Sequence, residues 1–468
     1  MKIGIVCFAW GKDHRGGLET HVSGLAKLLS EYGHQVFIHC INEKGTDNQY
    51  NAKGWKEGSL QIDQTNYNYS DTRCLFDFQR VPQAEIILRD WINHNQLDII
   101  DFHHNLFFGI RAVRSCSKLV PTVVTLHDYW CIDPQCSLFD SEHSIIGPDD
   151  HDKWEQNSLK SSDQTSKSLE SADYYTQIAT IKDKNTPRIS LKSAWARYSN
   201  QMLQYASAII TPSKETASIL HQHGMNQKIS VVENGLNLSF PRGQLANEIS
   251  DTSTGEPPGE RIRIGILGNV APHKGQLRFC EALLEGKLQK WLKVELHGPI
   301  PDTYQGDQSS QKRIIEIANN YPNLLKLNGP YDKEDLSSIF SQLDVVAMPS
   351  LWQEVYGFVA REALAYGLPI IITDAGGLAG LSDHEGVFTL PMAHPEHWGK
   401  SLREGLEEGP FFRWTYQRRK GIPMPSDFIP SNQDCARKIE NLYQRLIADH
   451  SKQFDNSTKP IPGSRPST

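Results

Sequence analysis

The chain has 468 residues, with 48 Lys and Arg against 55 Asp and Glu and a formal net charge of −7 at pH 7. Its length is enough for two or three ordinary domains, and a mildly acidic chain is unlike a nucleic-acid-binding domain, which is usually basic. No apolar run approaches the ~18 residues of a membrane-spanning helix, and residues 1–6 enter a strand without an apolar targeting segment. The 8 scattered cysteines favour a reducing compartment over a disulfide scaffold.

Short apolar strands alternate with helical segments through the first half of the chain. Between the first two strands, leucine and valine recur at helical spacing from Leu18 to Leu29. This alternation is typical of a parallel sheet whose two faces are covered by helices. The expected strands are residues 3–8, 35–41, 97–102, 122–126, 208–211 and 229–232.

A pair of glycines, Gly16 and Gly17, follows the first strand and opens the first helix. Paired glycines let the backbone approach a ligand closely, and a helix N-terminus attracts anions. The spacing is not G-x-G-x-x-G, which disfavours a nicotinamide dinucleotide. A plain strand-to-helix turn would look the same, so the sequence alone leaves both interpretations open.

Histidines follow two later strands. His127 and Asp128 come directly after the strand at 122–126, and His103 with His104 ends the strand at 97–102. Open α/β sheets bind ligands beyond the carboxyl ends of their strands, and an imidazole or carboxylate there can act as a base if it reaches a hydroxyl. We therefore take His127 and Asp128 as candidates and His103 with His104 as cleft lining, although a lone histidine is more often structural.

Two polar stretches divide the chain. Residues 140–190 are rich in Ser, Asp, Lys and Gln and predict a long surface insertion, either a plain solvated loop, which we favour, or a lid on the acceptor side. Residues 243–260 are rich in Pro and Gly and predict a linker. The first domain is therefore expected over residues 1–242.

A second α/β series follows the linker and predicts a second domain over residues 261–430. A helix is expected at 431–450, where apolar residues are spaced for one face, and the Ser/Pro-rich tail 451–468 is expected to be disordered. Two α/β halves around a linker place a cleft between them, which is a preferred ligand site. The expected strands of this half are residues 263–267, 294–297, 324–327, 345–348 and 369–373.

A loop with a lysine follows the first strand of the second half. It begins at Gly268 and Asn269 and reaches Lys274 just before the next helix, and Gly298 ends the following strand. A lysine in such a loop can neutralise a diphosphate leaving group, an effect commonly worth about 10²–10³ in rate. The alternative is an ordinary solvated surface lysine.

The most informative segment, residues 349–369, carries Glu354 and Glu362 with seven residues between them. Glu354 precedes Gly357 in the turn into a helix, and Glu362 lies inside that helix, about a turn and a half further on. Two solvated glutamates are the alternative interpretation. The glycines at both ends of the helix and the Pro-Ser turn before it argue against that alternative.

This E-x7-E segment closely resembles the signature of the retaining glycosyltransferases of family 4, also called glycosyl transferases group 1. The resemblance covers most of the chain, because Gly16 and Gly17, His127 with Asp128, and Lys274 also match motifs of that family. Asn269 departs from the pattern, since the family commonly has an arginine there. The resemblance implies the GT-B fold, an α/β architecture in which two Rossmann-like α/β/α domains face each other across a cleft, with the terminal helix packed back on the first domain.

The resemblance also implies an activity: transfer of a sugar from a nucleoside-diphosphate donor to a hydroxyl acceptor, with retention at the anomeric carbon. Glu354 would hold the sugar hydroxyls and the developing oxocarbenium charge, and Glu362 the ribose. His127 would contact the donor sugar, with Asp128 orienting it or accepting a proton. No cofactor and no metal are expected, because loop amides and a lysine offset the diphosphate charge. The residues implied in donor binding are Gly16, Gly17, Asn269, Lys274, Gly298, Gly357, Phe358, Val359 and Glu362.

The expected partners are a nucleotide-sugar donor and a hydroxyl acceptor, which is a glycan, a lipid-linked sugar or a small molecule, and no nucleic acid. This chemistry belongs to glycan, polysaccharide or glycolipid biosynthesis. We expect a cytoplasmic protein with at most a peripheral contact at the inner membrane face, because no strongly basic amphipathic helix is present. The alternatives are another GT-B activity, such as a sugar-nucleotide epimerase or phosphorylase, and a non-catalytic nucleotide-binding scaffold.

Overall fold

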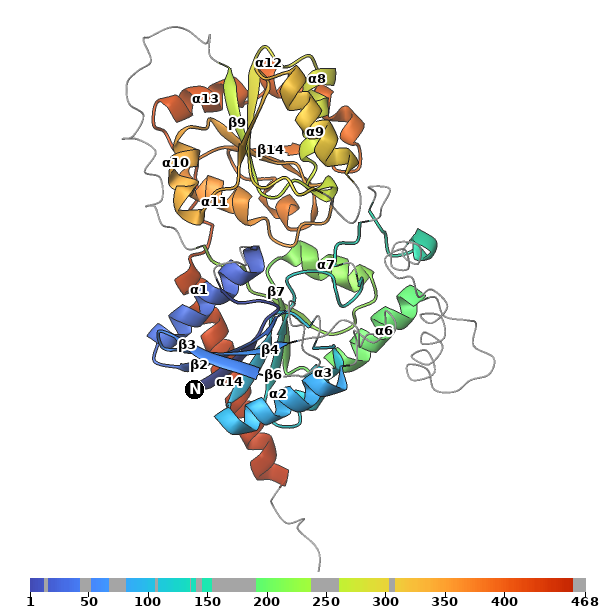
Figure 1. The fold of residues 1–468 in the computed structure, drawn as a ribbon, viewed down its shortest axis with the longest axis vertical. Coiled ribbons are helices and arrows are strands. Elements are labelled where there is room, and N and C mark those ends of the chain that lie inside the picture. The colour runs from blue at the N-terminus through green and yellow to red at the C-terminus, as the bar shows by residue number, and fades with distance from the viewer. Residues whose placement is uncertain are drawn as a thin grey trace, which may run out of the picture.

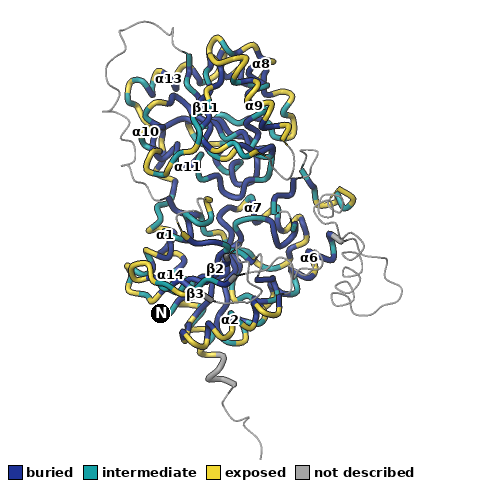
Figure 2. The backbone as a smooth tube through the Cα atoms, viewed as in Figure 1, coloured by how far each residue is buried: buried dark blue, intermediate teal, exposed yellow. Residues whose placement is uncertain are grey.

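Two α/β lobes make up the computed structural model of the chain, with the N-terminal residues in the lower lobe of Figure 1 and most of the C-terminal half in the upper one. Buried backbone fills the centre of each lobe, and exposed segments surround it (Figure 2). The predicted architecture, two Rossmann-like α/β domains facing each other, is therefore confirmed. The structure describes residues 1–11, 16–42, 52–66, 81–105, 108–134, 136–139, 145–153, 191–236, 261–302 and 308–457.

The N-terminal lobe is built on a sheet of eight described strands in the order β3-β4-β2-β1-β5-β6-β7-β8. All neighbours are parallel except β3 and β4, which form an antiparallel pair at one edge. The central strands are apolar and buried on both faces, as expected for strands with helices on either side. The strands are β1 Lys2–Val6, β2 Gln35–Asn42, β3 Ala52–Glu57, β4 Leu60–Asn66, β5 Ile99–Phe102, β6 Thr122–Thr125, β7 Ala208–Thr211 and β8 Ile229–Val231.

The edge pair β3 and β4 is absent from the sequence prediction. Strand β3 carries two Lys and one Glu, and β4 carries two Gln, one Asp and one Asn, so both lack the apolar run that identified the central strands. An edge strand has only one neighbour, and charged residues there prevent pairing with other chains. Strand β4 nevertheless contributes Leu60 and Ile62 to the core, and this alternation was the available signal.

The C-terminal lobe contains a parallel sheet in the order β11-β10-β9-β12-β13-β14. The loops after β9 and β12, neighbours at the centre of this sheet, carry the lysine and the first glutamate of the predicted site. The edge strand β14 was not predicted, because its four residues follow a glycine turn and only the last of them, Leu390, is fully buried. The strands are β9 Ile262–Leu267, β10 Leu292–His297, β11 Leu325–Gly329, β12 Val345–Met348, β13 Ile370–Thr373 and β14 Val387–Leu390.

Helices cover both sheets, and most are amphipathic with one buried face. No helix within the described residues is long and apolar enough to cross a membrane. The helices that cover the N-terminal sheet or its ends are α1 Gly17–Glu31, α2 Pro82–Asn95, α3 Arg111–Cys116, α6 Leu191–Leu203 and α7 Lys214–Gln222. Those of the second half are α8 Gln276–Glu285, α9 Ser309–Asn320, α10 Leu336–Ser341, α11 Phe358–Tyr366, α12 Trp398–Glu407, α13 Phe411–Arg419 and α14 Asn432–Ser457.

The last helix, α14, crosses back to the N-terminal lobe and packs beside α1 (Figure 1). Its residues Ala436 and Ile439 belong to the same apolar cluster as the strands β1 and β2. The hydroxyl of Tyr443 donates a 2.6 Å hydrogen bond to the buried carboxylate of Asp101 at the end of β5. The helix extends to Ser457, beyond the expected end at residue 450, because helical backbone hydrogen bonding continues through the polar sequence.

Three predicted segments fall wholly or partly outside the described residues. The expected linker at 243–260 lies outside them, and so do residues 458–468 of the expected tail. Of the insertion predicted at 140–190, residues 145–153 are described. Lys192, at the start of α6, donates hydrogen bonds to the carbonyls of Gly147, at 2.7 Å, and Pro148, and this fastens the described part of the insertion to the N-terminal lobe.

Candidate active site

Glu354 lies in the turn between β12 and α11 and is almost fully buried. Three donors converge on its Oε1 atom: Nζ of Lys274 at 2.7 Å, Ser350 Oγ at 2.8 Å and Trp352 Nε1 at 2.7 Å. Burial alone would raise the pKa of Glu354, but Lys274 and the two neutral donors hold it below its usual value. Glu354 is therefore a carboxylate at neutral pH, and within the described residues no donor contacts its Oε2 atom.

The lysine loop reaches Glu354 through a close contact that only glycine allows. Gly275 has φ +71°, and a Cβ atom there would lie 1.8 Å from the carbonyl oxygen of Pro349. The loop can thus press against the turn before Glu354, which places Lys274 Nζ 4.7 Å from the centre of the Trp352 ring. The ammonium group has a carboxylate and an aromatic face as neighbours, and its side chain remains 31% exposed. Lys274 is therefore not a fully solvated surface lysine.

Helix α11 begins at Phe358, after Gly357 in a left-handed conformation with φ +79°. The free amides of its first turn, at Phe358 and Val359, have the geometry of an anion-binding helix start. A Cβ atom on Gly17 would lie 2.9 Å from the Phe358 ring. The glycine pair of the N-terminal lobe therefore meets the start of α11, and Gly17 must lack a side chain for the lobes to approach this closely.

Glu362 lies further along α11 and is partly buried. Its Oε1 atom is 3.7 Å from Lys333 Nζ. Burial raises the pKa of Glu362 above its usual value, and Lys333 offsets this only in part. Glu354 and Glu362 thus differ although both belong to one motif: Oε1 of Glu354 accepts three hydrogen bonds, one of them from a lysine, whereas Glu362 is partly buried with a single cation 3.7 Å away.

The other predicted donor-binding residues of the second lobe lie at the carboxyl ends of β9 and β10. Gly298 approaches Gly268 so closely that a Cβ atom on it would lie 2.0 Å from the Gly268 carbonyl oxygen. The side chain of Asn269 is exposed, and its carbonyl accepts a 2.9 Å hydrogen bond from Gln276. These contacts fix the backbone of the loop, although Asn269 replaces the arginine that is common in the family at this position.

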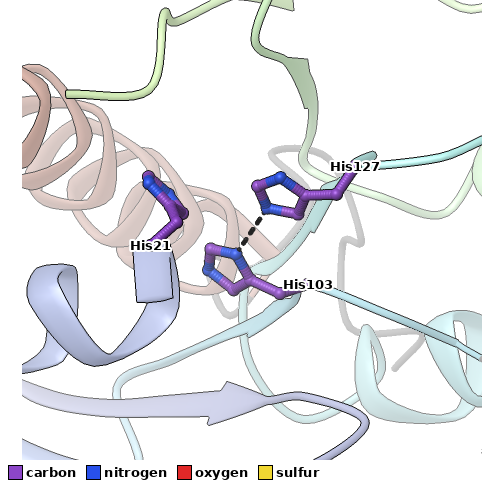
Figure 3. Close-up of side chains that lie close together, drawn as sticks. All are labelled: His21, His103 and His127. Atoms are coloured by element: carbon purple, nitrogen blue, oxygen red, sulfur yellow. Dashed lines mark hydrogen bonds between the residues drawn. The ribbon is translucent and has the colours of Figure 1, made fainter. Parts of the chain in front are cut away.

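Three histidines meet at the carboxyl ends of β5 and β6, on the N-terminal side of the site (Figure 3). His127 Nε2 lies 2.9 Å from Nδ1 of His103, with their rings stacked 5.2 Å apart. His21, from α1, packs against both, with ring centroids 5.8 Å from His103 and 5.2 Å from His127. His103 and His104 line a small hollow at these strand ends together with His127, as predicted, but His103 is only 1% exposed and supports His127 from beneath.

We expected Asp128 to orient His127 or to accept a proton, but Asp128 does not contact His127 in the structure. Its Oδ2 atom is 2.6 Å from His104 Nε2, and its Oδ1 atom accepts the backbone N–H of Trp130 at 2.8 Å. Burial opposes a charge on His104, but Asp128 raises the pKa of this imidazole above its usual value. The orienting partner of His127 is His103, because the turn after β6 directs the Asp128 carboxylate toward its own backbone and toward His104.

The two lobes are tied together directly beside Glu354. The carbonyl of Val355 accepts hydrogen bonds from Ser213 Oγ at 2.9 Å and from Thr216 Oγ1 at 3.0 Å, both at the start of α7. Trp352 also reaches the N-terminal lobe, where it meets the Tyr129 ring edge-on at 6.5 Å. The turn that carries Glu354 is thus held by hydroxyls from one lobe and by the sheet of the other.

Sequence reasoning missed four residues of this arrangement: His21, Ser350, Trp352 and Ser213. His21 sits on the buried face of α1, where it reads as one more core position of an amphipathic helix. Trp352 and Ser350 lie inside the most informative segment, and their proximity to Glu354 in sequence was a usable signal. Nothing local marks Ser213, because its partner Val355 is 142 residues away.

Comparison with known families assigns the chain a class. The family model described as Glycosyltransferase Family 4 matches residues 15–166, and the one described as Glycosyl transferases group 1 matches residues 250–411. The two matches together span more than half of the chain and correspond to its two lobes. The chain therefore belongs to the group 1 and family 4 glycosyltransferases.

Individual relatives agree with this class. A D-inositol 3-phosphate glycosyltransferase of Corynebacterium efficiens is 26% identical over 212 residues, which are 42% of this chain and 48% of the relative. The chain thus spans about half the length of the curated relatives it matches. Sucrose-phosphate synthase from Thermosynechococcus elongatus (TM-score 0.61, 15% identity) matches 96% of this chain and 99% of its own. Anabaena Alr3699/HepE in complex with UDP and glucose (TM-score 0.58, 16% identity) matches 95% and 99%. At these identities the structures show the fold alone.

Proposed function

We propose that this protein transfers a sugar from a nucleoside-diphosphate donor to a hydroxyl acceptor, with retention of the anomeric configuration. The observation that carries the proposal is the buried contact of Lys274 with Glu354, 2.7 Å apart, beside the start of α11. A cation, a carboxylate and free helix-start amides are what a sugar diphosphate requires: positive groups for its phosphates and an acceptor for its hydroxyls.

Each group then has one role in the transfer. Lys274 and the amides of Phe358 and Val359 stabilise the negative charge that grows on the diphosphate as it leaves. Because these groups offset that charge, the reaction is proposed to need no metal ion. Glu354 Oε2, the oxygen without a protein donor among the described residues, accepts hydroxyls of the sugar, and its charge stabilises the oxocarbenium-like carbon. Glu362 accepts the ribose hydroxyls.

His127 stands across the lobe boundary from these groups and is proposed to contact the donor sugar and help place the acceptor. Burial and its histidine neighbours keep the pKa of His127 well below its usual value, so the ring is neutral. A neutral imidazole can accept a hydroxyl proton or donate to a sugar oxygen, depending on its tautomer. The acceptor hydroxyl is proposed to attack on the face from which the diphosphate leaves, which retains the anomeric configuration.

The donor base is proposed to be found among the common nucleotides, with UDP tested first because Alr3699/HepE has been crystallised with UDP. The protein is screened by thermal shift against UDP, GDP, ADP and TDP without added metal, with NAD as the control. A ligand that binds only the folded state raises the midpoint with its saturation. One diphosphate should give a clear shift, and a shift with none of them would contradict the proposal.

Turnover is tested next with the matching UDP-, GDP-, ADP- or TDP-sugars and a panel of acceptors that includes inositol phosphates, the acceptor class in the names of the curated relatives. His127→Ala should lower kcat strongly while the diphosphate still gives its thermal shift. Diphosphate binding without turnover on any acceptor would instead indicate the non-catalytic scaffold. Both matching families are glycosyltransferases, which gives no support to an epimerase or a phosphorylase.

A further inference from the structure

His21, His103 and His127 form a compact group that the proposed transfer uses only in part. They come from three elements, α1 and the ends of β5 and β6, and their rings face a common centre (Figure 3). One nitrogen from each ring lies within 4.8 Å of the nitrogens of the other two. Donor binding in the proposed function involves His127 alone, which leaves the convergence of the other two rings unexplained.

The group holds buried polar atoms that have no partner. Neither ring nitrogen of His21, which is only 4% exposed, has a hydrogen-bond partner among the described residues. The Nε2 atom of His103 also makes no hydrogen bond, but it faces the Asp101 carboxylate at 3.5 Å. Buried nitrogens without partners, such as those of His21, are rare in folded proteins, because each gives up its water contacts without replacement. The free nitrogens of His21 beside two further histidines indicate a ligand.

A carboxylate stands behind the group where a metal-bound histidine normally has one. Asp101 Oδ2 is 3.5 Å from Nε2 of His103, on the side of the ring away from His127. Asp101 is itself fixed by Thr125 Oγ1 at 3.0 Å and by the hydroxyl of Tyr443 at 2.6 Å. A ligating imidazole commonly donates its second N–H to such a carboxylate, which sets its tautomer and orientation.

We propose that His21, His103 and His127 bind a divalent transition-metal ion of the Zn²⁺ class. Imidazole nitrogens suit Zn²⁺, Cu²⁺ and Ni²⁺, and three histidines with one open position are a known zinc arrangement. Zn–N distances near 2.0–2.1 Å need nitrogens about 3.4 Å apart, so small ring rotations must draw the present group together. The ion replaces the hydrogen bond between His103 and His127 and satisfies one of the two free nitrogens of His21.

The ion is an inhibitor and not a cofactor of the transfer. It occupies the nitrogen of His127 that faces His103 and fixes a ring that must otherwise contact the sugar. This part rests on the proposed function, whereas metal binding itself does not. Of the other two candidate groups among the described residues, one consists of His104, Asp128 and Cys136, and the first two of these already pair with each other. The other, at His394, Glu396 and His397, is exposed and serves as a control.

The test is a titration of tag-free, EDTA-treated full-length protein with Co²⁺, which reports tetrahedral nitrogen coordination by its visible absorption. One equivalent should bind to the wild type. His21→Gln, which removes a ligand but keeps a polar side chain of similar size, should weaken binding by at least about 100-fold, since even changes behind a ligand cost 10- to 100-fold. His397→Ala, at the exposed group, should leave the titration unchanged.

Three results would overturn the site: no bound Co²⁺ in the wild type, equal binding in His21→Gln, or a sulfur-to-metal band that points to Cys136. A cooperative melting transition of His21→Gln near the wild-type midpoint, measured without any ligand, shows that the variant is folded. Zn²⁺ should inhibit sugar transfer by the wild type and much less by His21→Gln, and equal inhibition would contradict the regulatory part. If no transfer is found at all, the proposed function fails while the Co²⁺ spectrum still reports the metal site.

Discussion

The loop that carries Glu354 and the histidine group around His127 lie on the two sides of the lobe boundary and differ in how far their polar atoms are hydrogen-bonded. Around Glu354 one carboxylate oxygen takes three donors, and a cation balances its charge. Around His127 the rings are neutral, and buried nitrogens are left without partners. In the first region Oε1 of Glu354 already has its donors, so we call these contacts the complete network, and a ligand can bind at Oε2 without displacing them. In the second region nitrogens without partners gain contacts when a ligand arrives, so we call it the incomplete network.

The largest expected effect comes from removing the charge of the complete network. Glu354→Gln should lower kcat by about 10²–10³, because the variant cannot stabilise the positive charge on the sugar. The diphosphate should still raise the melting midpoint, since Lys274 and the helix start remain. Glu285→Gln, which breaks a surface pair with Arg278 of the same 2.7 Å length, is the control and should keep full activity. Full activity in Glu354→Gln would remove the catalytic assignment.

The cation of the same network should affect binding. Lys274→Ala should weaken UDP, or whichever diphosphate binds, by about 10- to 100-fold, the equivalent of the ~1.5–3 kcal/mol of a charge-assisted hydrogen bond. The free nucleoside should bind about as before, and isothermal titration with both ligands measures the difference. Lys293→Ala is the matched control, because Lys293 is 33% exposed and pairs with Glu295 at 2.9 Å, away from the site. An equal loss for nucleoside and diphosphate would contradict a phosphate role.

The incomplete network is backed by Asp101, which faces His103 and is held by the Tyr443 hydroxyl. Tyr443→Phe removes the hydroxyl that holds the buried Asp101, and it should lower the free energy of unfolding by about 1.5–3 kcal/mol in urea denaturation. Tyr416→Phe, at an exposed position, should change stability by less than about 0.5 kcal/mol. If the two variants are equally stable, the contact between α14 and β5 does not stabilise the N-terminal lobe.

The smallest expected effect is the pH dependence of stability that Glu354 causes. The folded state lowers the pKa of Glu354 below its ordinary value of 4.5, so the carboxylate contributes stability above that value. This contribution is lost as the pH falls through 4.5 and then through the lower pKa of the folded state. The free energy of unfolding, measured by urea denaturation, should therefore fall more steeply with decreasing pH below 4.5 in the wild type than in Glu354→Gln. Parallel curves would mean that the pair with Lys274 adds no stability.

The same contrast explains how much of the molecule the sequence could predict. The parallel strands, the two lobes and Glu354 were predictable, because each depends on a short apolar run or on a motif within about twenty residues. Lys274 was predictable as a member of such a motif, although its contact with Glu354 spans 80 positions. The polar edge strands β3 and β4 were missed, because their stability comes from neighbours in the sheet and not from their own hydrophobicity.

The histidine group could not be predicted as a group. His103 and His127 were noticed because each follows a strand, but no property of the sequence fixes the distance between their rings. His21 carries no local signal, since a buried face of α1 accepts histidine only where the fold leaves room for it. The prediction that Asp128 orients His127 was wrong for a similar reason: the partner of Asp128 is His104, which lies at the end of the neighbouring strand, 24 positions earlier.

The return of α14 to the N-terminal lobe has a consequence for how the protein is made. Residues 1–236 emerge from the ribosome first, but the surface that α14 covers includes core residues Val22 and Leu25 on α1 and the carboxylate of Asp101. Until α14 is synthesised, this apolar surface has no native cover, whereas N-terminal domains usually fold during synthesis. A fragment that ends near residue 242 should for the same reason be prone to aggregation, and supplying α14 as a separate peptide should restore its solubility.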